Sequence, residues 1–284
     1  MALKTVIRKL VPPIILDAAR AFRSRPSARM PEYEYIPEGW ARQDEAIKGW
    51  NQASVMEAYL KRWPDFVRNL QGAGPLGLSP EAKTASNDDI FAHNIMVSFA
   101  YALALATHGK SQVSFLDWGG GFGHYYLIAK AMLPGIEINY HCKDLPLLVE
   151  QGQKLLPEAH FYTDDAWMKQ QYDFILASGA LQFARDWQAE LKKIASAANS
   201  YVLITRLPVV VDVPSFVVVQ RPYAYGYNTE YLGWYLNRKE FLDAVAGTGL
   251  VLQREFLTHP RVRVQNAPEE GSYRGFLFKV PDHP

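Results

Sequence analysis

The feature that most constrains this chain is a cluster of glycines within residues 113–124, Val-Ser-Phe-Leu-Asp-Trp-Gly-Gly-Gly-Phe-Gly-His. Its apolar start predicts a buried strand, and the residues from His124 to Met132 predict a helix that ends before Pro134. Glycines permit a tight turn with positive φ and let a ligand approach the backbone closely. The free N–H groups at the start of the helix suit an anionic group such as a carboxylate. We therefore predict a ligand site at this strand-turn-helix unit.

Beyond this unit the pattern predicts an α/β fold. Further strands are expected at 136–141, 160–163, 172–177, 201–207, 250–257 and 273–280, and helices at 146–156, 187–198 and 237–247. Such alternation predicts a Rossmann-like, seven-stranded, mostly parallel sheet with helices on both faces. In folds of this kind ligands bind beyond the carboxyl ends of the strands.

The chain before this sheet predicts an N-terminal arm and a helical cap over residues 1–110, leaving 111–284 as the ligand-binding domain with an aromatic insertion at about 208–236. Cap helices are expected at 43–70, where Pro64 should kink or end a segment, and from a cap at Asn87 to Gly109. Residues 24–39 predict a linker. The basic arm, residues 1–25, either rests on an anionic membrane surface, packs on the main domain or is disordered.

Composition narrows the class of protein and its compartment. Thirty basic against twenty-nine acidic residues give a formal charge of +1, without the basic excess expected of a nucleic-acid-binding protein. The single cysteine, Cys142, excludes an internal disulfide framework and fits a reducing cytoplasm. No run approaches the roughly eighteen apolar residues of a transmembrane helix. We expect a cytoplasmic protein, and the basic arm leaves open the alternative that it is located at the inner face of the membrane. The sequence does not predict an oligomeric state.

The glycine spacing indicates which ligand to expect. The dinucleotide fingerprint G-x-G-x-x-G fails, because His124 stands where the third glycine should be. The pattern Asp117-x-Gly119-x-Gly121-x-Gly123 instead resembles motif I of the class I S-adenosylmethionine (SAM)-dependent methyltransferases. The resemblance implies SAM as cofactor, a turn that passes under its methionyl part, and an acidic residue that engages its amino group. The residues it implies are Asp117, Trp118, Gly119, Gly120, Gly121 and Gly123, with His124 beside the methionyl carboxylate.

Acidic residues after the next two strands complete the expected cofactor site. Asp144 lies roughly 20 residues beyond the glycines, where a carboxylate can bind ribose hydroxyls, although it could also simply stabilise a helix start. With Leu145 it forms an Asp-Leu-Pro sequence that resembles small-molecule O-methyltransferases. The resemblance implies that Asp164 or Asp165 accepts a hydrogen bond from the adenine amino group. Ser178 is expected on the floor beside the transferred methyl, or in an ordinary tight turn.

The sequence constrains the residues that bind the methyl acceptor less than those that bind the cofactor. Methyl transfer from a sulfonium requires alignment and exclusion of water, and an alcohol acceptor also requires a base. His259, after the sixth strand, and Asp212, after the fifth, are the candidate bases. The residues proposed to contact the acceptor are Gln182, Arg206, Tyr225 and Tyr227; the alternative role of the tyrosines is to pack the insertion onto the sheet. No spacing predicts a zinc site, and no acidic cluster calls for Mg²⁺.

The whole chain is similar to a group of bacterial methyltransferases that occur alongside surface-polysaccharide biosynthesis. The similarity is carried by Leu116 to Gly121 with Tyr125 and Tyr126, by Asp144-Leu145-Pro146, and by the aromatic insertion before Asn237. It implies O-methylation of a sugar in a surface glycan or its precursor. Two alternatives stay open: N- or O-methylation of another small metabolite, and a non-catalytic subunit that binds SAM or a nucleotide.

Overall fold

The computed structural model describes residues 30–74 and 89–281. The basic residues of the arm, up to Arg25, and the expected helix cap Asn87 lie outside these ranges, so the hypotheses about them stay as they are. The residues from Glu32 onward form one unit, which contains the sheet and its helices.

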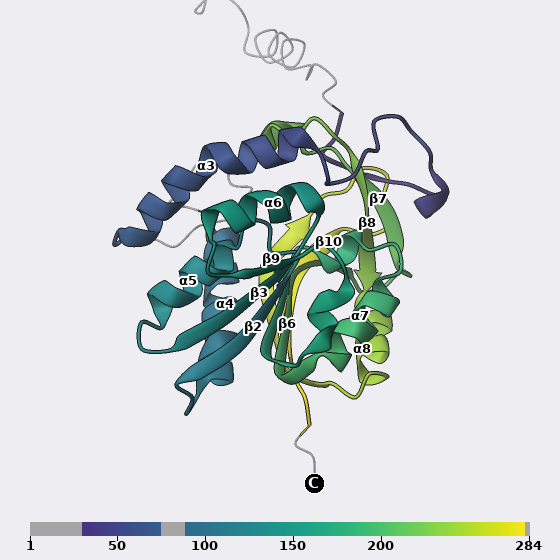
Figure 1. Ribbon diagram of the computed structural model, residues 1–284. Coiled ribbons are helices and arrows are strands. Elements are labelled where there is room, and N and C mark those ends of the chain that lie inside the picture. Colours follow the sequence, from purple (N-terminus) through teal and green to yellow (C-terminus); the bar gives the residue numbers. More distant parts are fainter. Residues whose placement is uncertain (1–29, 75–88, 282–284) are drawn as a thin grey trace, which may run out of the picture. The chain divides into compact units, whose positions relative to one another are not determined.

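The predicted parallel sheet is present, and the fold class is confirmed (Figure 1). Its strands follow one another across the sheet in the order β4-β3-β2-β5-β6, with β10 and β9 beyond β6. The pairs among the first five strands are parallel, whereas β10 runs antiparallel to both β6 and β9. These seven strands are β2 (Gln112–Trp118), β3 (Glu137–Lys143), β4 (His160–Tyr162), β5 (Tyr172–Ser178), β6 (Ala198–Val210), β9 (Val251–Val262) and β10 (Gly271–Lys279).

Helices cover both faces of the sheet. Helices α4 (Ile90–Thr107) and α5 (His124–Met132) pack on one face, and α7 (Trp187–Ser196) and α8 (Arg238–Ala246) pack on the other (Figure 1). The strands β2, β5 and β6 each send alternate apolar side chains into both packing layers. This two-sided burial explains why their sequences are continuously apolar instead of alternating. Helix α6 (Pro146–Leu155) connects β3 to β4.

Helix α4 is long and apolar enough to cross a membrane by length and composition, and it is the one such helix in the described part of the chain. Half of that window is buried inside the protein. Phe99, Ala102 and Leu103 are among its fully buried residues, and they pack with residues of the sheet. The apolar character of α4 is therefore accounted for by its place in the core.

Three strands that the sequence did not predict extend the sheet on one side. Strand β8 (Tyr231–Asn237) pairs in parallel with the last two residues of β6, β7 (Phe216–Gln220) pairs with β8, and β1 (Tyr33–Tyr35) pairs with β7. The expected linker thus supplies a strand, and the expected aromatic insertion supplies two. The insertion and the start of the cap therefore fold together.

Buried ion pairs connect the insertion to the start of the cap. Arg221, at the end of β7, is 7% exposed and forms ion pairs with Glu34 at 2.8 Å and Glu230 at 3.2 Å. Tyr223 donates a hydrogen bond to the same Glu230. One guanidinium therefore connects β1, β7 and the residue before β8.

The cap helix α3 (Ala53–Gln71) begins ten residues later than predicted and continues through Pro64. The preceding residues instead run as an irregular segment whose backbone bonds to the insertion: Gly49 donates to the Glu230 carbonyl, and Glu230 donates to the Ala46 carbonyl. Helix α3 packs on α6 through Val55, Tyr59 and Leu148. This places the irregular segment above the carboxyl ends of the strands.

Candidate active site

The glycine turn after β2 has the backbone conformation that its sequence predicts. Gly119, Gly121 and Gly123 have φ of 78°, 61° and 87°, a region that favours glycine. A Cβ at Gly119 would lie 2.3 Å from the Ala180 Cβ, and one at Gly123 would lie 2.7 Å from the Leu156 side chain. At those two positions the protein itself, and not a ligand, takes up the space beside the glycine.

Asp144, after β3, is joined directly to this turn. Its carboxylate accepts hydrogen bonds of 2.6 Å from the backbone N–H groups of Gly121 and Leu145. Burial raises the pKa of this carboxyl, and the two N–H donors oppose that rise. Asp144 thereby fixes the glycine turn against the end of β3, with the remaining lone pairs of its oxygens available to a ligand.

A cavity of about 770 Å³ opens beside the turn, at the carboxyl ends of β2, β3 and β5. That volume lies within the range of small-molecule sites. Of the expected cofactor residues, those that line it are Trp118, Gly119, Gly120, Gly121, His124, Asp144, Leu145, Asp165 and Ser178. The sequence therefore identifies residues that are far apart in the chain and meet at one cavity.

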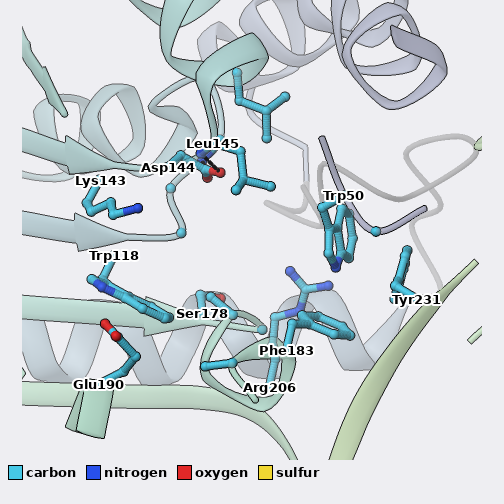
Figure 2. A pocket seen from close by; sticks show the side chains of 18 of the residues that line it. Trp50, Trp118, Lys143, Asp144, Leu145, Ser178, Phe183, Glu190, Arg206 and Tyr231 are labelled. Atoms are coloured by element: carbon cyan, nitrogen blue, oxygen red, sulfur yellow. Dashed lines mark hydrogen bonds between the residues drawn. The ribbon is translucent and has the colours of Figure 1, made fainter. Parts of the chain in front are cut away.

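The cavity has two ends of different character (Figure 2). At one end the Trp118 ring lies between Lys143 and Glu190. At the other, Trp50, Phe183 and Tyr231 gather around the guanidinium of Arg206. The Trp50 and Tyr231 rings stack with centroids 4.3 Å apart and planes 22° apart. One end is thus polar and flanked by charges, and the other is aromatic with the Arg206 guanidinium at its inner edge.

Asp117 lies beneath the glycine turn and does not line the cavity. It is 1% exposed and accepts a 2.7 Å hydrogen bond from the Tyr140 hydroxyl. A Cβ at Gly120 would come within 2.5 Å of the Asp117 carboxyl carbon, so the carboxyl packs directly against this glycine. Burial raises the pKa of Asp117 to about 7. The structure gives this side chain a supporting position under the turn.

His124, the first residue of α5, lies at the cavity among aromatic rings. Tyr59, Trp63 and Phe66 all contact the imidazole, with ring centroids 4.7 to 5.7 Å away. Burial lowers the pKa of His124 to about 3, so the ring is neutral at physiological pH. Its Nδ1 is buried and has no hydrogen-bond partner in the described part of the protein. A buried polar atom of this kind, next to Gly121, fits the polar methionyl part of SAM.

The two aspartates after β4 have separate positions. Asp165 lines the cavity, whereas the Asp164 side chain accepts a hydrogen bond from the Ala166 N–H and caps a short 3-10 helix. Ser178 lines the cavity from the end of β5, and its hydroxyl is 2.8 Å from that of Tyr125. Of the two alternatives for adenine, the structure therefore favours Asp165.

Arg206 reaches the cavity through an irregularity in β6. On β10, Arg274 pairs with Leu207 and Phe276 pairs with Ile204, so Thr205 and Arg206 together face the single residue Gly275. This is a β-bulge, and such bulges bend a strand and re-aim side chains. Arg206 has φ of 54°, which costs a non-glycine residue roughly 1–2 kcal/mol.

The space for the Arg206 guanidinium comes from Gly179, after β5. A Cβ at that glycine would lie 3.2 Å from the Arg206 Cζ. The side chain of Gln182 does not line the cavity; its amide donates a 3.4 Å hydrogen bond to the Arg206 carbonyl and so supports the bulge. Gln182 is thus placed behind Arg206, and not at the acceptor surface where the sequence analysis expected it.

Four other expected site residues do not reach the cavity. His259 is on β9, the edge strand two places from β6, and its ring packs on Phe91. Asp212 is exposed on the loop after β6, where its backbone N–H donates to Glu269. Neither is placed to act as a base. Tyr227 is 1% exposed and packs between Trp50 and Tyr59, with Tyr225 beside it, so these tyrosines join the cap to the insertion.

The sequence missed most of the aromatic end. Trp50 was expected on a helix, but it lies in the irregular segment before α3. Phe183 follows β5 on a short 3-10 helix, and Tyr231 begins β8. The dense aromatics of the insertion were the available signal, yet the wrong tyrosines were selected because the strand β8 was not recognised. In the described residues no group of three His, Cys, Asp or Glu side chains could hold a metal ion.

No protein-family model and no curated protein sequence matches the chain. Solved structures do match it. One is the magnesium protoporphyrin IX methyltransferase of Synechocystis PCC 6803 with bound SAM, at 13% identity over 80% of this chain and 95% of that one, with a TM-score of 0.47. Another is the N-terminal domain of EvdMO1 with S-adenosylhomocysteine (SAH) and D-fucose, at 13% identity over 84% and 100%, with a TM-score of 0.48.

A third is the 1,6-didemethyltoxoflavin-N1-methyltransferase of Burkholderia thailandensis, at 14% identity over 89% of this chain and 100% of that chain, with a TM-score of 0.46. These likenesses concern the course of the chain. The residues that line the cavity determine what it binds.

Proposed function

We propose that this protein is a SAM-dependent methyltransferase that acts on a small-molecule acceptor. The observation that carries the proposal is the junction of the glycine turn with Asp144 at the mouth of a cavity beyond the carboxyl ends of the strands. Parallel α/β sheets bind nucleotide-like ligands at this edge. The residues present also fit the ligand, since His124 and Trp118 line the cavity and each carries a buried ring nitrogen that has no hydrogen-bond partner among the described residues.

The two ends of the cavity suggest how the methyl donor lies. The adenosine part would occupy the end with Trp118, where Asp165 can accept a hydrogen bond from the adenine amino group and Asp144 can accept from ribose hydroxyls. The methionyl part would lie along Gly119 to Gly121, close to His124. The methyl group would then point to the aromatic end, near Ser178. SAM supplies a methyl group on a positively charged sulfur; the protein aligns it and excludes water.

For the acceptor, the proposal retains the sugar of a surface glycan or its precursor that the sequence similarity implies. Trp50 and Tyr231 support a ring-shaped acceptor, because aromatic faces pack well on other rings. Methylation of another small metabolite on N or O would use the same site. The compartment proposed is the reducing cytoplasm, which the free, buried Cys142 fits.

Calorimetric titration of the purified protein with SAM and with SAH tests the cofactor assignment. The wild type should bind both. Asp144→Ala should bind SAM about 10- to 100-fold more weakly, because it loses hydrogen bonds to the ribose and to the Gly121 N–H, worth on the order of 1–3 kcal/mol together. Glu150→Ala is the matched control, an exposed carboxylate on the following helix whose partner is Lys154. A wild-type protein that binds neither compound would refute the proposal.

Turnover separates the enzyme from the non-catalytic alternative. Labelled methyl transfer from SAM should be measured on extracts and on a panel of ring-bearing acceptors. Formation of a methylated product and SAH is expected. Tight binding of SAM without transfer to any acceptor would favour the subunit that only binds SAM.

A further inference from the structure

The aromatic end of the cavity offers a narrow set of chemical groups to an acceptor. Trp50 and Tyr231 form a stacked pair, and Phe183 meets the Trp50 ring at an interplanar angle of 63° with centroids 5.1 Å apart. Figure 2 shows the Arg206 guanidinium reaching up beside Trp50. The surface available to the acceptor therefore combines ring faces with the permanent positive charge of Arg206, and Lys48 and Arg185 also line the cavity.

The positive charge is held in place by the fold. The bulge in β6 turns Arg206 into the left-handed region, the missing side chain of Gly179 leaves room for the guanidinium, and Gln182 bonds the Arg206 carbonyl. The backbone strain is borne by a non-glycine residue at the cavity edge. Strain of this kind is concentrated at functional sites. The guanidinium position is thus fixed before any acceptor enters.

Each carboxylate that lines the cavity already has a partner within the protein, and Asp144 and Asp165 are the two assigned to the methyl donor. Asp144 holds the Gly121 and Leu145 N–H groups, Asp165 and Glu190 each lie 2.9 Å from the Lys193 ammonium, and Asp186 caps α7 through the Ala189 N–H. Figure 2 places Glu190 below Trp118, at the opposite end from Trp50.

The one histidine on the cavity wall, within the part of the chain that the structure describes, is His124. It is enclosed by aromatic rings, and its lowered pKa makes it a weak proton acceptor. The described carboxylates and the histidine of the cavity wall therefore favour a nucleophile that needs no proton removed.

We propose that the acceptor is a ring-bearing carboxylate, with one carboxylate oxygen paired to Arg206, the other attacking the methyl group, and the ring packed on Trp50. The inference rests on the proposed function and narrows its substrate class. The new bond joins the carboxylate oxygen to the methyl carbon, and the bond between that carbon and sulfur breaks with its electron pair going to sulfur. The products are a methyl ester and SAH. The negative charge of the acceptor and the positive charge of the sulfonium cancel, so no proton is released.

Two kinds of molecule carry this chemistry, an aromatic carboxylate and a sugar carboxylate. The experiment titrates the SAH-loaded protein with both kinds and with the matching carboxamides. Preference for one kind of carboxylate identifies the source of the ring. We expect at least tenfold tighter binding of the carboxylate than of its amide. If no ring carboxylate binds better than its amide, the proposal is wrong.

Arg206 variants test the pairing. Arg206→Gln should bind SAH as the wild type does and lose the preference for carboxylate over amide, by about 10- to 100-fold. Arg206→Lys should retain part of the preference, which distinguishes lost charge from altered folding. Arg254→Gln, an exposed arginine on β9 away from the cavity, is the matched control and should behave as the wild type.

Turnover of a true acceptor gives an independent readout. Proton release in weakly buffered solution should be below one-tenth of a proton per SAH formed, and base treatment should cleave the methylated product. One proton per turnover, or a base-stable ether or amine, would overturn the carboxylate proposal and leave the methyltransferase assignment intact. Absence of SAM and SAH binding would instead overturn the proposed function itself.

Discussion

The left-handed conformation of Arg206 makes a prediction about stability that does not depend on any ligand. At ordinary positions in a strand, glycine is less stable than alanine by roughly 0.5–1 kcal/mol because it loses more backbone freedom on folding. At Arg206 φ is 54°, where alanine would carry a cost of roughly 1–2 kcal/mol that glycine avoids. At this position the glycine variant should therefore be more stable than the alanine variant, the reverse of the usual order of stability.

We expect Arg206→Gly to be more stable than Arg206→Ala by about 0.5–1 kcal/mol, the difference between those two effects. Both variants remove the whole side chain beyond Cβ, so lost packing and lost charge largely cancel in the comparison. In a domain of this size the difference corresponds to about 1–4 °C in melting temperature. Both variants should lose acceptor binding, so the more stable of the two gains nothing in function.

The measurement is urea unfolding of the ligand-free protein, comparing midpoints at an unchanged slope. The control pair is Arg254→Gly and Arg254→Ala, at an exposed position of β9 that has no positive φ, where alanine should be the more stable. If Arg206→Ala is as stable as Arg206→Gly, or more stable, Arg206 is not held in a strained conformation. The account of the bulge given above would then be wrong.

Two further predictions concern buried charge. Burial raises the pKa of Asp117 to about 7. The folded ligand-free protein therefore binds more protons than the unfolded chain between about pH 4 and 7. Its free energy of unfolding should fall as pH rises through that window and level off above it. Asp117→Asn should flatten the fall by up to roughly 1.4 kcal/mol per pH unit, and an unchanged slope in urea unfolding at pH 5, 6 and 7 would contradict the assignment. Arg221→Met should cost about 3–5 kcal/mol, since it leaves Glu230 buried without its cation. Adding Glu230→Gln should recover part of that loss in the same assay, and no recovery would count against the ion pair as the cause.

The parts of the site that the sequence predicts well are those whose chemistry is local. The glycine turn needs positive φ at Gly119, Gly121 and Gly123, and only glycine adopts it readily, so the residue type reveals the conformation. Asp144 follows from its distance along the chain, because a parallel strand and one helix fix where the next strand ends. Both inferences require only one strand-helix-strand unit.

The aromatic end could not be predicted in the same way, because it depends on strand pairs distant in sequence. Trp50 reaches the cavity because the backbone just before it, at Ala46 and Gly49, bonds to Glu230 in the insertion. Tyr231 is positioned by the pairing of β8 with β7 and β6, whereas the sequence predicts only an aromatic insertion there. The bulge at Arg206 carries no sequence signal, since a left-handed residue in a bulge is expected to be glycine.

Strand β6 explains why the two ends of the cavity differ in origin. It pairs with β10 on both sides of the bulge and with β5 before it, and the pairing with β5 fixes Ser178 and the end of the cavity assigned to the methyl donor. After the bulge its last two residues pair with the end of β8, whose first residue, Tyr231, pairs with Gln220 of β7 and stacks on Trp50. The donor side therefore depends on the central sheet, whereas the acceptor side depends on the cap and the insertion. Changes in the insertion can alter the acceptor side, whereas changes in α3 of the cap also reach the glycine turn, because Tyr59, Trp63 and Phe66 enclose His124 beside Gly121.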